Sequence, residues 1–398
     1  MTSPRAESLT GTNRIPSPPS QPKPKVLVVL GTRPEAIKLA SVVSQLKQRA
    51  DELETLLCVT AQHRGLLDGA LGLFDLSPDF DLDLMQPGQT LTGLTSRLLG
   101  AIEPVLKTVR PDLTVVQGDT TTTYCSALAS FYAGVRVAHV EAGLRTFDLH
   151  SPFPEEMNRA ATTQLAALHF APTQGAATNL TRAGIPSDAV HITGNTGIDA
   201  VLDVAKRLEA GMPSGLRLPL DTGRKLIVVT AHRRESFGDP FRYICNAIAE
   251  LARREDVQIV WPVHPNPNIE PLARSMLAGE PNIHLIEPLE YAPFIDLLRN
   301  ALFVITDSGG VQEEGPPLGK PVLVLRKETE RPEAVASGAA KLVGYDPKRI
   351  VREATLLLED PSEYGRMSRI QSPYGDGQAG ERIAGHISNF LRAGVSNP

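Results

Sequence analysis

The sequence predicts an α/β protein of two Rossmann-like domains whose parallel sheets face each other across a cleft. Short, continuous apolar runs alternate with amphipathic stretches, which indicates parallel strands buried on both faces by helices. The chain has 398 residues, more than one domain usually holds, and its 41% hydrophobic and 21% charged content is that of a globular protein. We therefore expect two such domains in one chain.

The predicted elements follow one another in two series. The first series of strands comprises Val26–Leu30, Leu56–Thr60, Leu113–Gln117, Val135–Val140 and Leu168–Ala171, and the second comprises Leu226–Thr230, Val257–Val263, Ile283–Ile286, Leu302–Thr306 and Pro321–Leu325. Helical patterns between them lie at Pro34–Arg49, Thr90–Val109, Thr121–Ala133 and Thr173–Ala183.

Composition suggests where the domains begin and end. Residues 1–24 are rich in Pro, Ser and Thr and lack the apolar core of a secretory signal, so they predict a disordered tail. Leu202–Arg224 is poor in strand signals and rich in Gly, Pro and charge, which separates the two series. We place an N-terminal domain at residues 25–194 and a C-terminal domain at residues 195–371, joined near Gly194–Asp203.

Charge and cysteine usage exclude several classes of partner. A formal net charge of -5 disfavours nucleic acid and anionic membranes, and no apolar run is long enough for a membrane helix. Cys58, Cys125 and Cys245 lie far apart without a CxxC pair, so we expect neither disulfides nor structural zinc, and a cytoplasmic location. The histidines form no HxxxH or HExxH pattern, and GxGxxG does not occur, so metal and dinucleotide sites are disfavoured.

Unusual polar residues stand where the predicted strands end. In open parallel sheets, ligands bind beyond the carboxyl ends of the strands. The residues at these ends are Gly31, Thr32 and Arg33, then Gly118 and Asp119, Glu141, His232 with Arg233, His264, and Asp307 through Gly310. Two such edges facing each other predict one site between the domains.

Two segments have the character of anion sites. In GTRPEAIK (31–38), Arg33 stands beside a positive helix end and Lys38 lies one turn further on, although an incidental Arg in a strand–helix turn fits equally well. In DSGG (307–310), Ser308 and the glycines open a helix whose first amides can approach phosphate, and a carboxylate one turn later can bind ribose hydroxyls. The alternative for this segment is a helix capped by Ser308.

Several acids and histidines are candidates for proton transfer, each with a plain structural alternative. Asp119 is also placed to cap a helix, Glu141 to begin one, and the carboxylates of SPFPEEMNR (151–159) to form a charged first turn. His232 is equally a candidate structural histidine. Asp119, Glu141 and His232 gain weight because three strand ends aim them into one cleft.

Taken together, the motifs resemble those of a known family. They are GTRPEAIK (31–38), TAQHR (60–64), GDTTTT (118–123), VEAGLRT (140–146), PFPEEMNR (152–159), TGNTGID (193–199), AHRRESF (231–237), PVHPNP (262–267), TDSGGVQEE (306–314), GKPVLVL (319–325), ERPEA (330–334) and PYGDGQA (373–379). From Lys25 to Leu391 the chain resembles the bacterial non-hydrolysing UDP-N-acetylglucosamine 2-epimerases.

The resemblance implies a GT-B-like fold, with UDP held mainly by the C-terminal domain and a terminal helix (372–394) returning to the N-terminal one. It implies reversible epimerisation of UDP-N-acetylglucosamine at C2, which gives UDP-N-acetylmannosamine. The reaction would proceed by elimination of UDP through 2-acetamidoglucal, without a metal or other cofactor. The resemblance also implies a homodimer that serves polysaccharide biosynthesis. The alternatives are a GT-B glycosyltransferase, a hydrolysing 2-epimerase, and a nucleotide-sugar sensor without turnover.

The resemblance also implies roles for individual residues. The catalytic set is Asp119, Glu141, Glu155 and His232, and the substrate-binding set is Arg33, Lys38, Leu289, Phe294, Ser308, Gly309, Gly310, Glu314 and Arg331. A second UDP-N-acetylglucosamine, bound as an activator, would involve Gln62, Arg64, Arg234 and His264. Leu289 departs from the Gln that family members often carry beside the uracil, so a side-chain amide contact is lost there.

Overall fold

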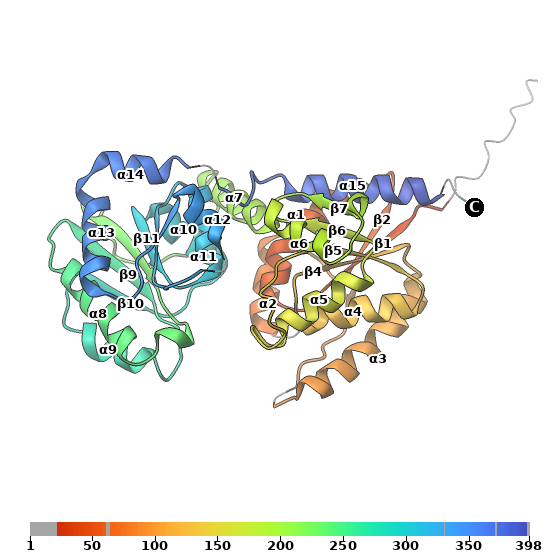
Figure 1. Cartoon of the computed structure of the whole chain (residues 1–398), viewed down its shortest axis with the longest axis horizontal. Coiled ribbons are helices and arrows are strands. Elements are labelled where there is room, and N and C mark those ends of the chain that lie inside the picture. The colour runs from red at the N-terminus through yellow and green to blue at the C-terminus, as the bar shows by residue number, and fades with distance from the viewer. Residues whose placement is uncertain (1–21, 61–63, 87, 330, 371, 396–398) are drawn as a thin grey trace, which may run out of the picture.

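The computed structural model describes residues 22–60, 64–86, 88–329, 331–370 and 372–395, so most of the predicted tail lies outside the described residues. The chain forms two lobes, each with one parallel sheet covered by helices (Figure 1). Among the helices of this described part, none is both long and apolar enough to cross a membrane.

The N-terminal lobe contains a seven-stranded sheet of order β3-β2-β1-β4-β5-β6-β7, in which all neighbours are parallel. Its strands are β1 (Lys25–Leu30), β2 (Glu54–Val59), β3 (Phe80–Asp81), β4 (Leu113–Gln117), β5 (Arg136–Val140), β6 (Leu168–Ala171) and β7 (Val190–Ile192). The strand order reverses between β1 and β4, and their carboxyl ends flank the crevice that such a reversal creates.

The C-terminal lobe repeats this plan with a six-stranded parallel sheet of order β10-β9-β8-β11-β12-β13. Its strands are β8 (Lys225–Thr230), β9 (Val257–Pro262), β10 (Ile283–Ile286), β11 (Phe303–Thr306), β12 (Val322–Val324) and β13 (Ala340–Leu342). Here the order reverses between β8 and β11, and the predicted residues His232 and Ser308 follow these two strands.

Helices cover both faces of each sheet. They are α1 (Arg33–Lys47), α2 (Arg64–Leu73), α3 (Leu91–Val109), α4 (Thr121–Tyr132), α5 (Glu155–Leu165), α6 (Gln174–Arg182), α7 (Thr196–Glu209), α8 (Asp239–Ala252), α9 (Glu270–Leu277), α10 (Tyr291–Asn300), α11 (Gly309–Glu314), α12 (Pro332–Ser337), α13 (Pro347–Glu359), α14 (Pro361–Ser368) and α15 (Ala379–Val395), with single 3-10 turns at Ser187–Ala189, Arg234–Ser236 and Pro316–Leu318.

Alternation along β1 divides the N-terminal core. Val26 and Val28 pack in one cluster with residues of α1, α7 and α15, whereas Leu27 and Val29 pack in another with residues of α3 and α4. Successive strand side chains point to opposite faces, so one uninterrupted apolar run serves both helix layers. Figure 1 shows α1 and α15 on one side of this sheet and α3 and α4 on the other.

The chain crosses between the lobes twice, and the two crossings touch. The amide of Asn195 donates to the carbonyl of Tyr374 at 2.7 Å, and Gly194 (φ 91°) and Gly375 (φ 141°) lie against each other. After the second crossing α15 packs along α1 of the N-terminal lobe (Figure 1). The terminal helix therefore packs on the first lobe.

Differences from the predicted elements are small and have local causes. Most predicted strands agree with the observed ones within one or two residues. The short strands β3, β7 and β13 escape prediction because their sequences, FD, VHI and AKL, are not continuous apolar runs. The predicted junction Gly194–Asp203 overlaps α7, so the stretch without strand signals begins inside a helix.

Candidate active site

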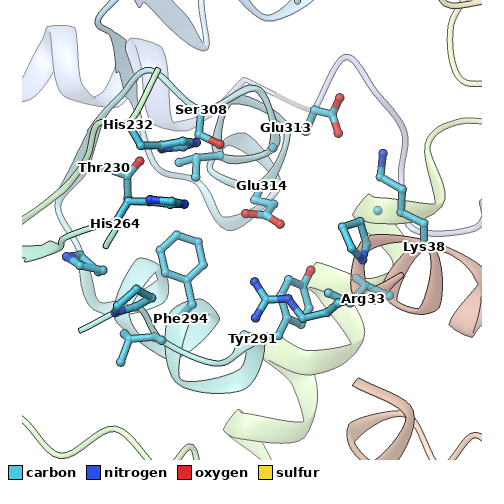
Figure 2. A pocket seen from close by; sticks show the side chains of 18 of the residues that line it. Arg33, Lys38, Thr230, His232, His264, Tyr291, Phe294, Ser308, Glu313 and Glu314 are labelled. Atoms are coloured by element: carbon cyan, nitrogen blue, oxygen red, sulfur yellow. The ribbon is translucent and has the colours of Figure 1, made fainter. Parts of the chain in front are cut away.

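A cavity of about 540 Å³ lies between the lobes, within the usual range for small-molecule sites. Thr230 and Pro262, the last residues of β8 and β9, line it from one lobe, and Arg33 and Lys38 of α1 line it from the other (Figure 2). The predicted site residues that line the cavity are Arg33, Lys38, His232, His264, Leu289, Phe294, Ser308, Gly310, Glu314 and Arg331. The fold thus brings residues from both series to one place.

Ser308 lies on the cavity wall at the start of α11. It occupies the N-cap position, but its side chain makes no capping hydrogen bond, so the interpretation as a simple helix cap is wrong. Its backbone amide instead donates to Thr306 Oγ1 at 2.9 Å. Figure 2 shows Ser308 close to His232. Gly310 also lines the cavity, whereas Gly309 does not appear among the described lining residues.

His232 is held by a buried carboxylate and a second imidazole. The amides of His232 and Arg233 both donate to Asp307 Oδ2 at 2.8 Å, and His232 Nδ1 lies 3.4 Å from Asp307 Oδ1. The His232 ring stacks on His264 with centroids 5.5 Å apart and an interplanar angle of 14°. Burial lowers the pKa of His232, although the nearby Asp307 carboxylate acts in the opposite direction. The lowered pKa favours a neutral imidazole at neutral pH, and the contacts with Asp307 and His264 hold the ring in place.

Lys38 links the cavity to the acids of the N-terminal lobe. Its amine forms an ion pair with the carboxylate of Glu141. Burial opposes the charge on Lys38, but Glu141 and Glu313 outweigh it and raise its pKa. Glu141 follows β5 with a φ of 61°, which is uncommon for a residue other than glycine. The next helix begins only at Glu155, so the interpretation of Glu141 as a helix-start acid is wrong.

Asp119 lies just after β4, near two other carboxylates. Its Oδ2 is 2.6 Å from Arg159 Nη2. Burial raises the pKa of Asp119, Arg159 opposes this, and Glu141 and Glu155 act in the raising direction, so both of these acids lie close enough to influence Asp119. Thr120, and not Asp119, caps α4, so the capping interpretation of Asp119 is wrong.

The paired carboxylates of α5 have different surroundings. Glu156 is buried, and its carboxylate accepts the amides of Thr146 and Phe147 at 3.1 Å. Glu155 is less buried and opens the helix, where it interacts with Asp119. Of this pair Glu156 therefore holds a loop, while Glu155 belongs to the acid cluster.

Sequence reasoning assigned no role of its own to Glu313, which occupies the centre of an ion network. Its buried carboxylate pairs with Arg331 and accepts from Asn195 Nδ2 at 3.0 Å. Burial opposes the charge, but Arg331 and Lys38 outweigh it and lower the pKa of Glu313. Glu314 differs, since burial and the neighbouring Glu313 raise its pKa to about 7. The local sequence pattern does not separate these adjacent acids, and only the resemblance to the family singled out Glu314.

Three further residues escaped prediction for a similar reason. Asp307 belongs to the segment predicted to bind phosphate, yet in the structure it orients His232. Arg159 ended a charged motif without a function, yet it pairs with Asp119. Tyr291 lines the cavity from the start of α10, and no pattern in the sequence distinguished it from a core tyrosine.

The residues predicted to bind an activator are only partly described. Gln62 lies outside the described residues, and Arg64 begins α2 without a described side chain. Arg234 is exposed in a 3-10 turn, while His264 lines the cavity against His232.

Within the described part of the chain, no group of three or more His, Cys, Asp or Glu side chains is placed to hold a metal ion.

Two parallel α/β lobes with a site at their facing strand ends define a GT-B-like protein. A glycosyltransferase of kitacinnamycin, 13% identical, shares this fold with a TM-score of 0.62 over 92% of this chain and 99% of that one. The profile of the UDP-N-acetylglucosamine 2-epimerases matches residues 44–388, and the chain belongs to this family. It is therefore an enzyme of the isomerase class.

Individual relatives agree with this assignment. A UDP-N-acetylglucosamine 2-epimerase of Salmonella typhimurium is 50% identical over 372 residues, which covers 92% of this chain and 99% of that protein. A crystal structure of the UDP-GlcNAc 2-epimerase of Neisseria meningitidis, bound to UDP-GlcNAc, is 44% identical with a TM-score of 0.84, over 92% of this chain and all of that one.

Proposed function

We propose that the protein interconverts UDP-N-acetylglucosamine and UDP-N-acetylmannosamine by eliminating UDP and adding it back through 2-acetamidoglucal. The observation that carries this proposal is the acid cluster of Asp119, Glu141 and Glu155 beside a cavity whose walls bear Arg33 and Lys38. Carboxylates for proton transfer and cations for a diphosphate are the two sets of groups that such an elimination needs.

The chemistry explains why elimination is preferred to direct deprotonation. C2 carries an N-acetyl group and has no adjacent carbonyl, so its hydrogen is barely acidic. In the elimination, the C1–O bond breaks and its electron pair leaves with UDP, while the C2 proton passes to a carboxylate and a C1–C2 double bond forms. Re-addition of UDP at C1, with a proton delivered to the opposite face of C2, completes the inversion.

Residues of both lobes divide this work. Arg33, Lys38 and His232 stabilise the departing diphosphate. Asp119, Glu141 and Glu155 exchange protons with C2, and burial, which raises the pKa of Asp119, makes its carboxylate a stronger base than an exposed one. We assign no acid to a particular face of the sugar. An enclosed site between the lobes keeps UDP and the glucal together until re-addition.

The nucleotide takes the C-terminal side of the cavity. Leu289 and Phe294 offer apolar surface for uracil, and Glu314 offers a carboxylate for the ribose hydroxyls. The remaining binding residues, for the phosphates, are Ser308, Gly309, Gly310 and Arg331. The Neisseria meningitidis relative bound to UDP-GlcNAc supports this choice of ligand.

We also expect a homodimer that needs no metal or redox cofactor.

We further expect activation by a second UDP-N-acetylglucosamine that binds at Gln62, Arg64, Arg234 and His264. A kinetic comparison tests this activation. UDP-N-acetylmannosamine alone should react slowly until a little UDP-N-acetylglucosamine is added. Full rate without that addition would remove the activator site from the proposal.

Proton NMR of the purified protein with UDP-N-acetylglucosamine as the sole addition tests the function. We expect signals of UDP-N-acetylmannosamine to appear, with the same rate after EDTA treatment. Release of free N-acetylmannosamine would indicate a hydrolysing epimerase. Sugar transfer that starts only when an acceptor is supplied would indicate a glycosyltransferase, and binding without turnover would indicate a sensor.

A further inference from the structure

The hydroxyl of Tyr291 is buried and has no hydrogen-bond partner among the residues that the structure describes. Tyr291 opens α10, is only 8% exposed, and belongs to the wall of the cavity between the lobes. A buried hydroxyl without a partner is costly, whereas phenylalanine would fill the same space without that cost. Such a group in a ligand cavity points to a partner supplied by the ligand.

The ring of Tyr291 is held so that its hydroxyl stays in this place. It packs against Phe74 at the end of α2, with ring centroids 6.2 Å apart and an interplanar angle of 47°. The helix α10 itself packs against α7. The ring therefore lies at the junction of the lobes, with Phe74 of the N-terminal lobe on one side and its own helix α10 of the C-terminal lobe on the other.

The neighbours of the hydroxyl identify the kind of ligand atom. Figure 2 shows the Tyr291 hydroxyl beside Arg33, on the side of the cavity where Glu314 lies. Burial and Glu314 raise the pKa of Tyr291, so the phenol keeps its proton and can donate it. When Glu314 is ionised, its carboxylate only accepts, and together with a phenol that donates it is complementary to a pair of hydroxyls, each of which both donates and accepts.

We propose that Tyr291 donates a hydrogen bond to a ribose hydroxyl of the bound nucleotide, next to Glu314, and thereby favours ribonucleotides over deoxyribonucleotides. This role rests on the proposed UDP-sugar function and extends it to the choice of sugar in the nucleotide. A site built to pair with a ligand hydroxyl discriminates against the analogue that lacks it, because the buried protein group is then left without a partner.

Calorimetric titration of wild type and Tyr291→Phe with UDP, 2′-deoxy-UDP and 3′-deoxy-UDP tests the proposal. Tyr291→Phe should weaken UDP binding roughly three- to tenfold, the effect of one neutral hydrogen bond. One of the two deoxynucleotides, the one that lacks the partner hydroxyl, should bind wild type and variant equally. Tyr364→Phe, in α14 and outside the cavity, is the matched control and should bind all three as wild type does.

The comparison between nucleotides separates recognition from a structural effect. The substitution removes one unpartnered oxygen, so the melting temperature of Tyr291→Phe should be equal to that of wild type or higher. An equal loss for all three nucleotides, or no loss for UDP, would overturn the role of Tyr291 and leave the proposed function intact. Failure of wild type to bind UDP at all would instead overturn the proposed function itself.

Discussion

Arg33 stands on the cavity wall with its guanidinium 3.5 Å from the carboxylate of Glu290. This pair is part-exposed and therefore weak, so it competes little with a phosphate. Arg33→Ala should weaken UDP binding by about 1.5–3 kcal/mol, the worth of a charge-assisted hydrogen bond. Calorimetry with Arg224→Ala, a change in an exposed ion pair outside the cavity, as the control measures the effect. Unchanged UDP affinity would take Arg33 out of the site.

Glu314 illustrates how a buried acid in the cavity wall lowers stability. Its pKa of about 7 in the folded protein lies above the ordinary value of 4.5. Between these values the folded chain holds a proton that the unfolded chain has lost, so the contribution of Glu314 to stability falls as pH rises through this window. Glu314→Gln should therefore raise the free energy of unfolding at pH 8 by about 2 kcal/mol, a figure reduced for the part-exposed side chain.

Urea denaturation at pH 8 and pH 4.5 checks this expectation for Glu314→Gln. The gain over wild type should be present at pH 8 and nearly vanish at pH 4.5, where the native carboxyl is already protonated. Glu255→Gln, an exposed position, should show no gain at either pH. An equal gain at both pH values would mean that the charge of Glu314 is not its cause.

Residues at strand ends were predictable because topology alone sends them to the same edge of a sheet. Arg33, His232 and Ser308 all line the cavity for this reason. The places of Glu313 and Tyr291 in the cavity wall were not predictable. Their significance depends on which side chains meet them from distant parts of the chain, and that information is absent from local pattern.

At the scale of elements, the attachment of α15 depends on one acid of α7. Asp199 Oδ1 accepts the amide of Gly380 at 2.8 Å, and Oδ2 accepts that of Ala379 at 3.2 Å. These are amides that the helix itself leaves without partners at its start. Gly380 lies so close to α1 that a Cβ there would be 2.6 Å from Ser41 Oγ, so α15 cannot shift to find other partners.

Asp199→Ala should consequently lower the free energy of unfolding by about 1–2 kcal/mol, the effect of losing a helix-capping carboxylate. Urea denaturation followed by circular dichroism measures it. Asp203→Ala, one turn further along α7, removes a part-exposed ion pair with Arg207 and should cost under about 0.5 kcal/mol. Equal losses in the two variants would show that capping of α15 is not what Asp199 contributes.

Elements were predictable in proportion to their burial. The continuous apolar strands β1, β4, β8 and β11 were found because both faces of each sheet are covered, which leaves no polar positions in the run. The short edge strands β3, β7 and β13 were missed, whereas the edge strand β10 was found because its IHLI sequence is mostly apolar. At an edge the chain pairs on one side only, so two or three residues suffice and the local sequence is not distinctive.

At the scale of the molecule, the lobes are joined by charge as well as by the two chain crossings. Lys38 pairs with Glu141 in the N-terminal lobe, and Arg331 pairs with Glu313 in the C-terminal lobe. Across the junction, the carboxylate of Glu313 also attracts the amine of Lys38. A diphosphate bound between them would meet cations from both lobes. Lys38 lines the cavity and pairs with Glu141, so it joins the cavity to the acid cluster of the proposed function.

The proposed elimination of UDP leads to a prediction for the enzyme as a whole. If UDP leaves and returns, the hydrogen at C2 passes to a carboxylate that exchanges with solvent. In deuterium oxide, UDP-N-acetylmannosamine formed from UDP-N-acetylglucosamine should carry deuterium at C2, as proton NMR or mass spectrometry can measure. Product with protium at C2 after the reaction reaches equilibrium would point to a hydride route and overturn the elimination.

Asp119→Asn connects the isotope result to a residue. The amide keeps the shape of the side chain and removes the base, so turnover should fall by roughly 10²–10⁴-fold. UDP binding should persist, because the nucleotide residues lie mainly in the other lobe, and Asp51→Asn, an exposed position, should behave as wild type. Slow escape of UDP and 2-acetamidoglucal from the variant would support elimination further. Unchanged turnover in Asp119→Asn would mean that the carboxylate of Asp119 only pairs with Arg159 and takes no part in proton transfer.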